Sequence, residues 1–308
     1  MSKAVVVRVP ASSANLGCAF DCAALALQLY LEVEAELRPQ GDLSIRYHGA
    51  TPERVTLDET NLITRILRQR LGEWGLPQGL RLEIHNQIPI GVGLGSSAAA
   101  IIAGLLAAHR LADRPPADDD ILTRAARLEG GHPDNVAAAW LGGFTLAVQT
   151  GERVRAWSCP VSNALQMVLV TPDYALPTEK ARAVLPAHYS RAESVHNLQR
   201  AAVLAAQFFS GQMKLAPFLF EDQFHQPYRA PLIPGLIEVL RLEHPSLAGI
   251  CLSGAGPSVL AFVNDDPEVV GRLICATLDK HGVRAEARVL AADNAGAKGW
   301  TEARQATR

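Results

Sequence analysis

Three glycines alternate with single residues between Ile88 and Ala100 and end in a serine pair, in the sequence Ile-Pro-Ile-Gly-Val-Gly-Leu-Gly-Ser-Ser-Ala-Ala-Ala. Glycine permits positive φ angles and lets backbone N–H groups come close to a ligand. The alanine-rich segment from Ser96 to Leu111 contains no proline and is expected to form a helix, whose N-terminus favours an anion. We therefore predict that this loop binds phosphate.

Two familiar phosphate loops do not match this stretch. A Walker A loop requires a lysine after its last glycine, and none follows Gly95; a dinucleotide fingerprint requires a third glycine where the chain has Ser96. A tight strand-to-helix turn without a ligand is the alternative interpretation. Three spaced glycines, a serine pair and a long apolar helix favour the phosphate site. One serine hydroxyl is able to cap the helix and the other is able to meet a metal ion.

A second group of chemistry-bearing residues lies between Glu129 and Asn135, in the sequence Glu-Gly-Gly-His-Pro-Asp-Asn. It places two carboxylates and an amide within seven residues, beside glycines and a proline that fix the backbone. A helix C-terminus is the alternative, but the cluster holds more ligand-type groups than a turn requires. The loop from Pro10 to Asp21, which carries Asn15, is equally compatible with ligand binding and with a plain turn.

Composition sets the class of protein. The 308 residues, 48% hydrophobic and 19% charged, indicate a globular protein that is long for one domain and suits two. A net charge of −2 gives no electrostatic reason to expect nucleic acid or an anionic membrane as a partner. Five scattered cysteines without a Cys-x-x-Cys pair favour reduced thiols and a cytoplasmic location. The longest apolar run, Ala98 to Ala108, is too short to span a bilayer.

The elements that must position these groups follow from hydrophobic periodicity and from turn residues. In the first half, strands are expected at Ala4–Val9, Cys22–Leu37, Leu80–His85 and Trp140–Val148. Helices are expected at Asn61–Leu71, Ser96–Leu111, Ile121–Glu129 and Val136–Trp140. The aspartate-rich segment from Asp113 to Asp120 is interpreted as a solvated loop with helix-capping residues, and no chemistry is assigned to it.

A second half is expected to begin near Trp157 and to alternate strands with helices. Its strands are expected at Gln166–Thr171, Ala248–Leu252, Val259–Val263 and Ala285–Leu290. Its helices are expected at Pro177–Arg182 with Thr178 as N-cap, Val195–Gly211, Phe218–Phe224, Gly235–Glu243 and Val269–His281. A polar loop at His225–Pro231, a glycine-rich turn at Ser253–Ser258 and a frayed tail after Ala295 complete the prediction.

Three blocks together resemble the motifs of the GHMP kinases, the superfamily named for galactokinase, homoserine kinase, mevalonate kinase and phosphomevalonate kinase. The blocks are Pro10–Asp21, Pro89–Ala99 and Leu252–Ser258. The first reads Pro-Ala-Ser-Ser-Ala-Asn-Leu-Gly and is similar to the homoserine kinase branch, as are His-Pro-Asp-Asn-Val from His132 and Leu-Ser-Gly-Ala-Gly-Pro-Ser-Val from Leu252. The resemblance extends from Val5 to about Leu290.

This resemblance implies an α+β fold with a two-domain GHMP kinase architecture. A ribosomal protein S5 domain 2-like N-terminal domain would cover residues 1–155 and carry the ATP-binding loop. A ferredoxin-like βαβ sandwich would form the C-terminal domain at 156–296, followed by a disordered tail at 297–308. The family also implies a homodimer.

The implied reaction is the phosphorylation of L-homoserine by ATP, with Mg²⁺, to give O-phospho-L-homoserine for threonine biosynthesis. Phosphoryl transfer depends mainly on positioning and charge neutralisation. By motif position, Mg²⁺ matches Ser97 and Glu129, a hydroxyl and a carboxylate of the kind that this ion accepts. The residues expected around ATP are Pro89, Ile90, Gly91, Val92, Gly93, Leu94, Gly95, Ser96, Ser97, Ala98 and Ala99.

The amino-acid acceptor requires a cation for its carboxylate and oxygen acceptors for its ammonium group. By motif position, Arg182 and Arg229 suit the carboxylate, since arginine binds it bidentately. The residues expected at the ammonium and hydroxyl end are Asn15, Asp21 and Asn135, and Thr178 is expected to orient the hydroxyl or a phosphate. Asp134 matches the general base proposed for mevalonate kinases, although the γ-phosphate itself is an alternative proton acceptor.

One departure from the family pattern is evident. Gly17-Cys18-Ala19-Phe20 replaces the usual Gly-Pro-Gly-Phe, which puts substrate details in doubt more than the reaction class. The alternatives are a sibling kinase for an isoprenoid precursor or a sugar, against which the two arginines argue, and a non-catalytic nucleotide sensor, against which Ser97 and Glu129 argue.

Overall fold

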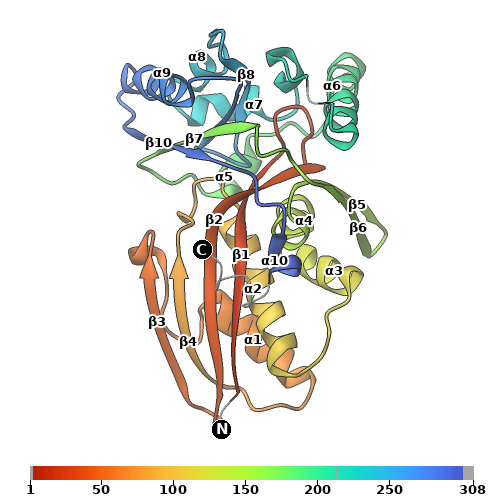
Figure 1. The fold of residues 1–308 in the computed structure, drawn as a ribbon, viewed down its shortest axis with the longest axis vertical. Helices are drawn as coiled ribbons and strands as arrows, with labels where there is room; N and C mark the ends of the chain where they lie inside the picture. The colour runs from red at the N-terminus through yellow and green to blue at the C-terminus, as the bar shows by residue number, and fades with distance from the viewer. Residues whose placement is uncertain (1–2, 213, 301–308) are drawn as a thin grey trace.

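The computed structural model describes residues 3–212 and 214–300, and they form two β-sheets (Figure 1). The first sheet has six strands in the order β3-β4-β2-β5-β6, with β1 paired to β2; the second has four in the order β10-β7-β9-β8. Helices cover both sheets. The expectation of a two-domain α+β architecture is confirmed by these two sheets with their own helices.

The first sheet is built on a long antiparallel hairpin of β1 (Ala4–Ala14) and β2 (Ala23–Arg38). Strand β2 pairs further with β4 (Gly79–Asn86) through its residues 31–38 and with β5 (Phe144–Thr150) through its residues 23–25. Strand β5 forms a hairpin with β6 (Arg153–Cys159). Strand β1 does not end at Val9 as expected. It continues past a register shift after Pro10, because residues 10–14 are buried and pair with β2.

Two strands were not predicted from the sequence. Strand β3 (Leu43–Gly49) is an edge strand that runs parallel to β4, and its residues are mostly exposed or half-buried. Strand β6 has only one fully buried residue, Val154. Leu43, Ile45 and Tyr47 alternate with polar residues and pack against the hydrophobic core, so β3 carries a strand signal that the prediction overlooked. The alternation in β6, of Val154 with Ala156, is shorter. Strand β6 also extends across the predicted domain boundary at residue 155, which stays a prediction.

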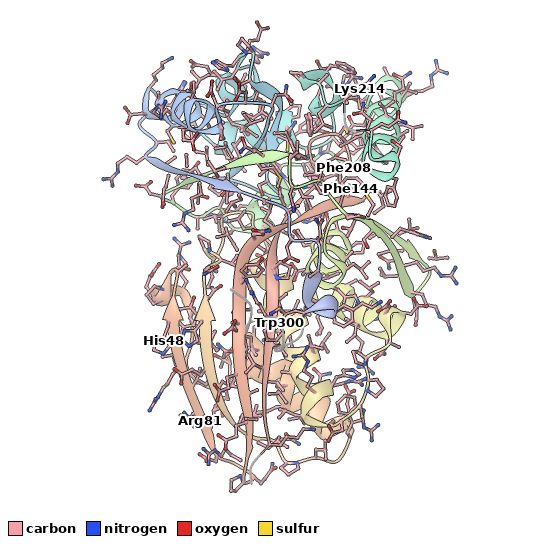
Figure 2. The ribbon with its side chains drawn as sticks, in the orientation of Figure 1. His48, Arg81, Phe144, Phe208, Lys214 and Trp300 are labelled. Atoms are coloured by element: carbon pink, nitrogen blue, oxygen red, sulfur yellow. The ribbon has the colours of Figure 1, made fainter. Side chains whose placement is uncertain are left out.

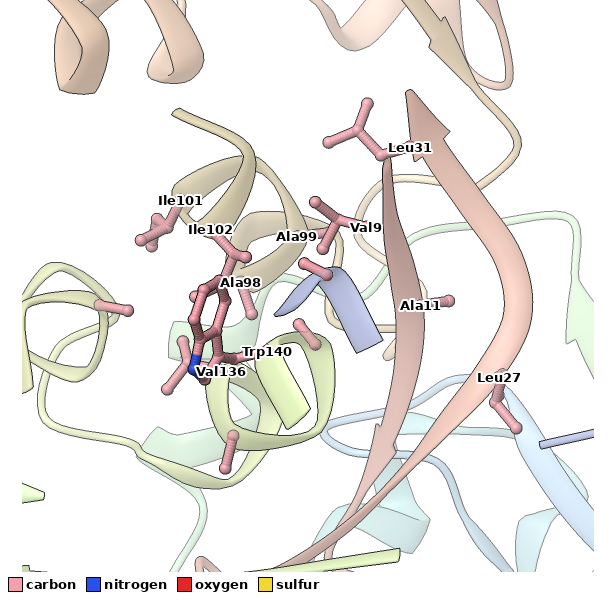
Figure 3. Packing of buried hydrophobic residues seen from close by; sticks show 14 of the residues in the cluster. Val9, Ala11, Leu27, Leu31, Ala98, Ala99, Ile101, Ile102, Val136 and Trp140 are labelled. Carbon is pink, nitrogen blue, oxygen red and sulfur yellow. The ribbon is translucent and has the colours of Figure 1, made fainter. Parts of the chain in front are cut away.

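Three helices pack against the first sheet: α2 (Ser96–Leu111), α3 (Asp118–Leu128) and α4 (Asp134–Leu141). Helix α1 (Leu62–Glu73) packs on α2. Helix α2 is central and is buried over most of its length, which explains its alanine-rich sequence, because small side chains let neighbouring elements approach closely. Figure 3 shows Ala98 and Ile102 of α2 beside the ring of Trp140 from α4.

The second sheet comprises β7 (Gln166–Pro172), β8 (Leu247–Leu252), β9 (Val259–Val263) and β10 (Ala285–Leu290). Helices α8 (Leu236–Leu240) and α9 (Pro267–Asp279) pack on one face. The other face joins the hydrophobic core of the first sheet through alternate residues such as Met167 and Leu169. The two sheets therefore share a continuous core and hold the loops between them in place.

The remaining elements of this half include α5 (Thr178–Ala183), α6 (Arg191–Ser210) and α7 (Gln226–Arg229). Three short 3₁₀ turns lie at Pro52–Arg54, Pro217–Phe220 and Ala230–Leu232. The predicted helix at Phe218–Phe224 is wrong beyond its first turn, since the backbone is extended at Glu221. The predicted loop at His225–Pro231 is wrong for residues 226–231, which form the helical turn α7 and the start of the 3₁₀ turn that follows it.

The chain returns to the first sheet after β10. Asp293 accepts a hydrogen bond from the Tyr30 hydroxyl, and a short helix, α10 (Gly296–Gly299), packs beside α4 (Figure 1). Ala297 and Trp300 are buried. The predicted tail is therefore wrong for residues 297–300, because the apolar side chain of Trp300 is covered by the fold (Figure 2). Residues 301–308 lie outside the described part of the chain.

Within the described residues, none of the helices combines the length and the apolar character needed to cross a lipid bilayer. The five cysteines are all free thiols, as the sequence predicts.

Candidate active site

The predicted phosphate loop turns between β4 and α2 with three glycines in the left-handed region. Their φ angles are 77° at Gly91, 83° at Gly93 and 63° at Gly95. A Cβ atom at Gly93 would lie 2.2 Å from the carbonyl oxygen of Ser253, and one at Gly95 would lie 2.1 Å from the Ser12 hydroxyl. Glycine is thus required at 93 and 95 both by φ and by the neighbouring motifs.

The carbonyl groups of this loop are tied to the two other predicted motifs. The Ser12 N–H donates to the Leu94 carbonyl at 3.1 Å, and the Ser253 hydroxyl donates to the Gly93 carbonyl at 2.7 Å. Among the described residues, no acceptor is found for the backbone N–H groups of Gly93, Gly95, Ser96 or Ser97. These donors sit at the N-terminus of α2, an arrangement that favours an anionic ligand.

The serine pair does not cap α2, so that expectation was wrong. The N-cap is Gly95 itself, with no side-chain cap. Instead, the Ser97 hydroxyl donates a 2.5 Å hydrogen bond to Oε1 of Glu129, the C-cap residue that follows α3. Burial raises the pKa of the half-buried Glu129 carboxyl. The two residues predicted to share a metal ion are therefore in contact, and both are hard oxygen donors that fit Mg²⁺.

Asp134 is the first residue of α4 and is only 3% exposed. Its carboxylate accepts a hydrogen bond from the Asn135 N–H at 2.7 Å. Burial raises the pKa of Asp134 to about 7, and the negative charge of Asp21 adds to this effect. Asp134 therefore exchanges a proton near neutral pH. The amide oxygen of Asn135 accepts a hydrogen bond from the Ser12 hydroxyl at 2.8 Å.

The loop after β1 holds Asn15 and Asp21 in the left-handed region, with φ of 72° and 53°. The Asn15 side chain donates to the Gly254 carbonyl at 3.0 Å and accepts from the Asp21 N–H at 3.0 Å. The amide N–H of Asn15 thus links the first motif to the third, while its oxygen fixes the loop of the first motif. Asn15 lines the cavity with its amide already engaged in these two hydrogen bonds, and its role toward a substrate stays a prediction.

Arg182 and Asp21 are paired with each other rather than free for a substrate. Two hydrogen bonds of 2.8 and 3.3 Å join the guanidinium to the carboxylate. Nδ1 of His132 lies 3.7 Å from the same carboxylate. Burial and the charge of Arg182 lower the pKa of His132, which favours its neutral form. The sequence assigned Asp21 and Arg182 to opposite ends of the acceptor, and the structure places the two side chains in one ion pair.

Arg229 is 1% exposed at the end of α7. Its Nε donates to the Ala181 carbonyl at 3.0 Å; its Nη1 lies 2.9 Å from the Gly254 carbonyl and 3.1 Å from Nδ1 of His225. Burial, helped by the charge of Arg182, lowers the pKa of Arg229 to about 10, so it stays charged at neutral pH. No hydrogen bond from Nη2 to a described residue is found, and Arg229 lines the cavity. A buried cation with a free donor fits a carboxylate.

These side chains surround one cavity of about 260 Å³ between the two sheets. It brings together most of the predicted site residues. Asp21 does not line the cavity, but it is hydrogen-bonded to Arg182, which does. Thr178 lines it and is exposed, and the predicted capping role is wrong because Pro177 is the N-cap of α5. The residues that line the cavity are Ala14, Asn15, Ile90, Gly91, Gly93, Leu94, Gly95, Ser96, Ser97, Glu129, His132, Asp134, Asn135, Thr178, Arg182, Arg229, Gly254 and Ala255.

Four lining residues were not predicted as site residues: Ala14, His132, Gly254 and Ala255. All four lie inside stretches that the sequence singled out for their small polar residues, glycine content or ligand-type density. The signal was therefore present, but the sequence did not show which side chains of each stretch face the cavity. Pro89, Val92, Ala98 and Ala99 were predicted around ATP and do not line this cavity.

The chain is similar in sequence and in fold to known kinases. The family model "GHMP kinases N terminal domain" matches residues 61–143. The chain is 46% identical to a homoserine kinase of Solibacter usitatus, over 87% of this chain and 88% of that protein, and 41% identical to one of Desulfitobacterium hafniense, over 95% and 99%. A crystal structure of homoserine kinase from Cytophaga hutchinsonii superposes with a TM-score of 0.83 at 26% identity, covering 96% and 97% of the two chains. L. major mevalonate kinase, with a TM-score of 0.63 at 15% identity over 93% and 98%, shares the fold.

Proposed function

The chain belongs to the homoserine kinase family of the GHMP kinases, and from this premise we propose that it phosphorylates L-homoserine with ATP. The product is O-phospho-L-homoserine, an intermediate of threonine biosynthesis. The observation that carries the proposal is the single cavity in which the glycine loop, the Ser97–Glu129 pair and the buried Arg229 meet. That cavity offers an anion site, a metal site and a carboxylate site.

The glycine loop is assigned to the triphosphate of ATP. Backbone N–H groups from Gly91 to Ser97 would hold the phosphate oxygens, and the N-terminus of α2 favours their charge. Ser97 and Glu129 would hold Mg²⁺ through their oxygens. Bound Mg²⁺-ATP supplies the phosphoryl group and neutralises its charge. The role of the protein is to position the two reactants against each other.

A neighbouring cavity of about 140 Å³ is assigned to the nucleoside. It shares Ile90 and Ser96 with the first cavity, so a ligand on the glycine loop reaches both. Its walls combine apolar side chains with a few hydrogen-bonding groups, as expected for a purine ring. The other residues that line it are Leu31, Tyr47, Arg54, Val55, Thr56, Asn61, Leu62, Ile63, Ile84, Asn86 and Ala100.

The acceptor is assigned to the end of the cavity that holds the two arginines. Arg229 is fixed by three hydrogen bonds and offers the two N–H groups of Nη2 to the α-carboxylate. The ion pair of Arg182 with Asp21 presents both signs of charge, which suits a zwitterion. Asp21 would accept from the ammonium group while Arg182 contributes to carboxylate binding. An uncharged sugar has no groups to match these two guanidiniums.

Asp134 is assigned to the hydroxyl of the acceptor. With a pKa of about 7, its carboxylate is available at neutral pH to accept a hydrogen bond from that hydroxyl and to take its proton. Asn135, hydrogen-bonded to Ser12 of the first motif, fixes the start of α4 beside it.

The location and assembly of the enzyme are also proposals. Five free thiols support a cytoplasmic enzyme. Exposed apolar side chains on α6, among them Val195, Leu198 and Phe209, support a homodimer. Light scattering coupled to size exclusion tests the assembly directly: a single peak at the mass of one chain rules the homodimer out.

A coupled assay of ADP release tests the proposed reaction. We expect ADP from Mg²⁺-ATP only when L-homoserine is present, and none with mevalonate or galactose. Saturating L-homoserine without ADP release rules out the proposed acceptor. Nucleotide binding without turnover on any member of the panel would instead favour a nucleotide sensor.

A further inference from the structure

Three side chains that can bind a metal ion gather on the outer face of the first sheet, away from the proposed active site. They are His48 on edge strand β3 and Glu83 and His85 on β4 (Figure 2 shows His48 at this edge). One ligand atom from each lies within 4.8 Å of the others. His48 Nε2 and Glu83 Oε1 are 2.7 Å apart, and the two imidazole rings stack at 4.8 Å with an interplanar angle of 16°.

Sheet geometry explains why these three side chains meet. His48 and His85 are direct partners in the parallel register of β3 and β4, and Glu83 lies two residues before His85 on the same face. Strand pairing therefore fixes the three Cα atoms, and only the side chains need to rotate. The two imidazoles are exposed, so such rotation meets little obstruction.

Charged side chains of both signs surround the cluster on this face. Glu32 pairs in register with His85, and Glu34 pairs with Glu83. Arg46 pairs with Glu83, Arg8 pairs with Glu32, and Arg81 lies two residues before Glu83. The case for a cation therefore rests on the three donor atoms themselves and not on the surrounding charge.

The donor set selects the kind of metal. Two imidazole nitrogens and one carboxylate oxygen match borderline dications such as Zn²⁺, whereas Mg²⁺ prefers oxygen donors alone. We propose that His48, Glu83 and His85 form a binding site for such an ion, with Zn²⁺ as the probe. The site is separate in position and chemistry from the Mg²⁺ site proposed at Ser97 and Glu129.

The opposite face of the same strand segments gives this site a consequence. Tyr47, Ile84 and Asn86 alternate with the three metal-binding residues and line the cavity assigned to the nucleoside. The Asn86 side chain donates to the Tyr47 hydroxyl at 2.9 Å, which links β3 to β4 behind that cavity. An ion that joins His48 to His85 would fix the edge strand against β4 at this point. This consequence for nucleotide binding rests on the proposed function, but the metal site itself does not.

Isothermal titration of zinc chloride into the nucleotide-free protein, in buffer that contains Mg²⁺, tests the site. We expect binding by the wild-type chain that is weakened about tenfold or more in His48→Asn, in His85→Asn and in Glu83→Gln. The matched control is His188→Asn, which removes an exposed imidazole outside the cluster and should bind as the wild type does. The far-UV spectrum of each variant confirms that it is folded.

Thermal unfolding provides a second readout that does not depend on activity. Zinc should raise the Tm of the wild type and of His188→Asn, because an ion that binds only the folded state stabilises it. The rise should be absent in His85→Asn. The proposal is overturned by absence of zinc binding to the wild type, or by cluster variants that bind zinc as strongly as the wild type.

Discussion

Each charged residue of the cavity has a chemical environment that limits its role. Glu129 is held by a 2.5 Å hydrogen bond from Ser97, and its pKa is raised by burial. Arg229 is buried, and backbone carbonyls fix its guanidinium. Asp134 is also buried, but among the described residues no guanidinium forms an ion pair with its carboxylate. The three residues therefore make different predictions for kinetics.

Glu129→Gln removes the negative charge and keeps the shape of the side chain. Since the proposed metal site would lose its only carboxylate, we expect kcat to fall by about a hundredfold or more, while ATP still binds through the glycine loop. Steady-state kinetics over a range of Mg²⁺ concentrations, with nucleotide binding by titration, measures both. The assignment of Glu129 to the metal is wrong if turnover stays at the wild-type level.

Arg229→Lys keeps the positive charge but loses the planar fork that reaches two carbonyls and the cavity. We expect the KM for L-homoserine to rise about tenfold to a hundredfold with a smaller effect on the KM for ATP. Arg284→Lys is the matched control, because Arg284 forms an exposed ion pair with Asp173 outside this cavity. An unchanged KM for L-homoserine in Arg229→Lys would remove this residue from the acceptor site.

Asp134→Asn removes the group proposed to receive the proton. Its pKa of about 7 means that the ionised form grows as pH rises through neutrality, so kcat/KM of the wild type should increase with pH and level off above about 7. In Asp134→Asn we expect a loss of about 10²- to 10⁴-fold in kcat and the disappearance of this inflection. A variant with the wild-type profile would favour the phosphate as the proton acceptor.

At the scale of elements, the site depends on the packing of the glycine loop against the turn that follows β8. Gly93→Ala would place a Cβ 2.2 Å from the Ser253 carbonyl at a φ of 83°. Gly75→Ala is the matched control, with a φ of 69° and no atom within 4 Å of the added Cβ. We expect Gly93→Ala to lower kcat/KM for ATP by about tenfold or more, since the loop must shift.

Gly75→Ala should change activity little and cost about 1 kcal/mol of stability from φ alone. Equal activity of the two variants would show that the contact with Ser253 is not needed.

The same elements show what sequence can and cannot predict. The glycine loop, helix α2 and the Glu129–Asn135 cluster were predicted because their signals are local: glycine spacing, alanine content and ligand density. Strand β3 was overlooked although Leu43, Ile45 and Tyr47 alternate with polar residues; what its sequence could not show is that it pairs in parallel with β4. The hydrogen-bonded pair of Asp21 with Arg182 was missed because it joins residues 161 positions apart in the chain.

At the scale of the whole molecule, the buried carboxyl of Asp134 links the chemistry of the site to the stability of the fold. Its ionised form is penalised by burial, and its pKa is raised from 3.8 to about 7 in the folded chain. The unfolded chain releases this proton at a lower pH, so the unfolded state binds fewer protons between about pH 4 and 7. The stabilisation that the protonated Asp134 gives the folded chain is therefore fully present below about pH 4. The free energy of unfolding falls as pH rises from there, and this stabilisation is lost once pH has passed through about 7.

Asp134→Asn should remove this pH dependence, because an amide stays neutral at every pH. At pH 8 we expect the variant to unfold with a free energy higher than the wild type by up to roughly 3 kcal/mol, and at pH 5 the difference should shrink by most of that amount. Urea unfolding at the two pH values measures it; since both proteins carry all other titrating groups, their difference isolates Asp134. A difference that stays constant between pH 5 and 8 would show that Asp134 does not titrate in this range. If the variant is more stable and yet nearly inactive, the buried carboxylate lowers the stability of the fold and is kept because the reaction requires a proton acceptor there.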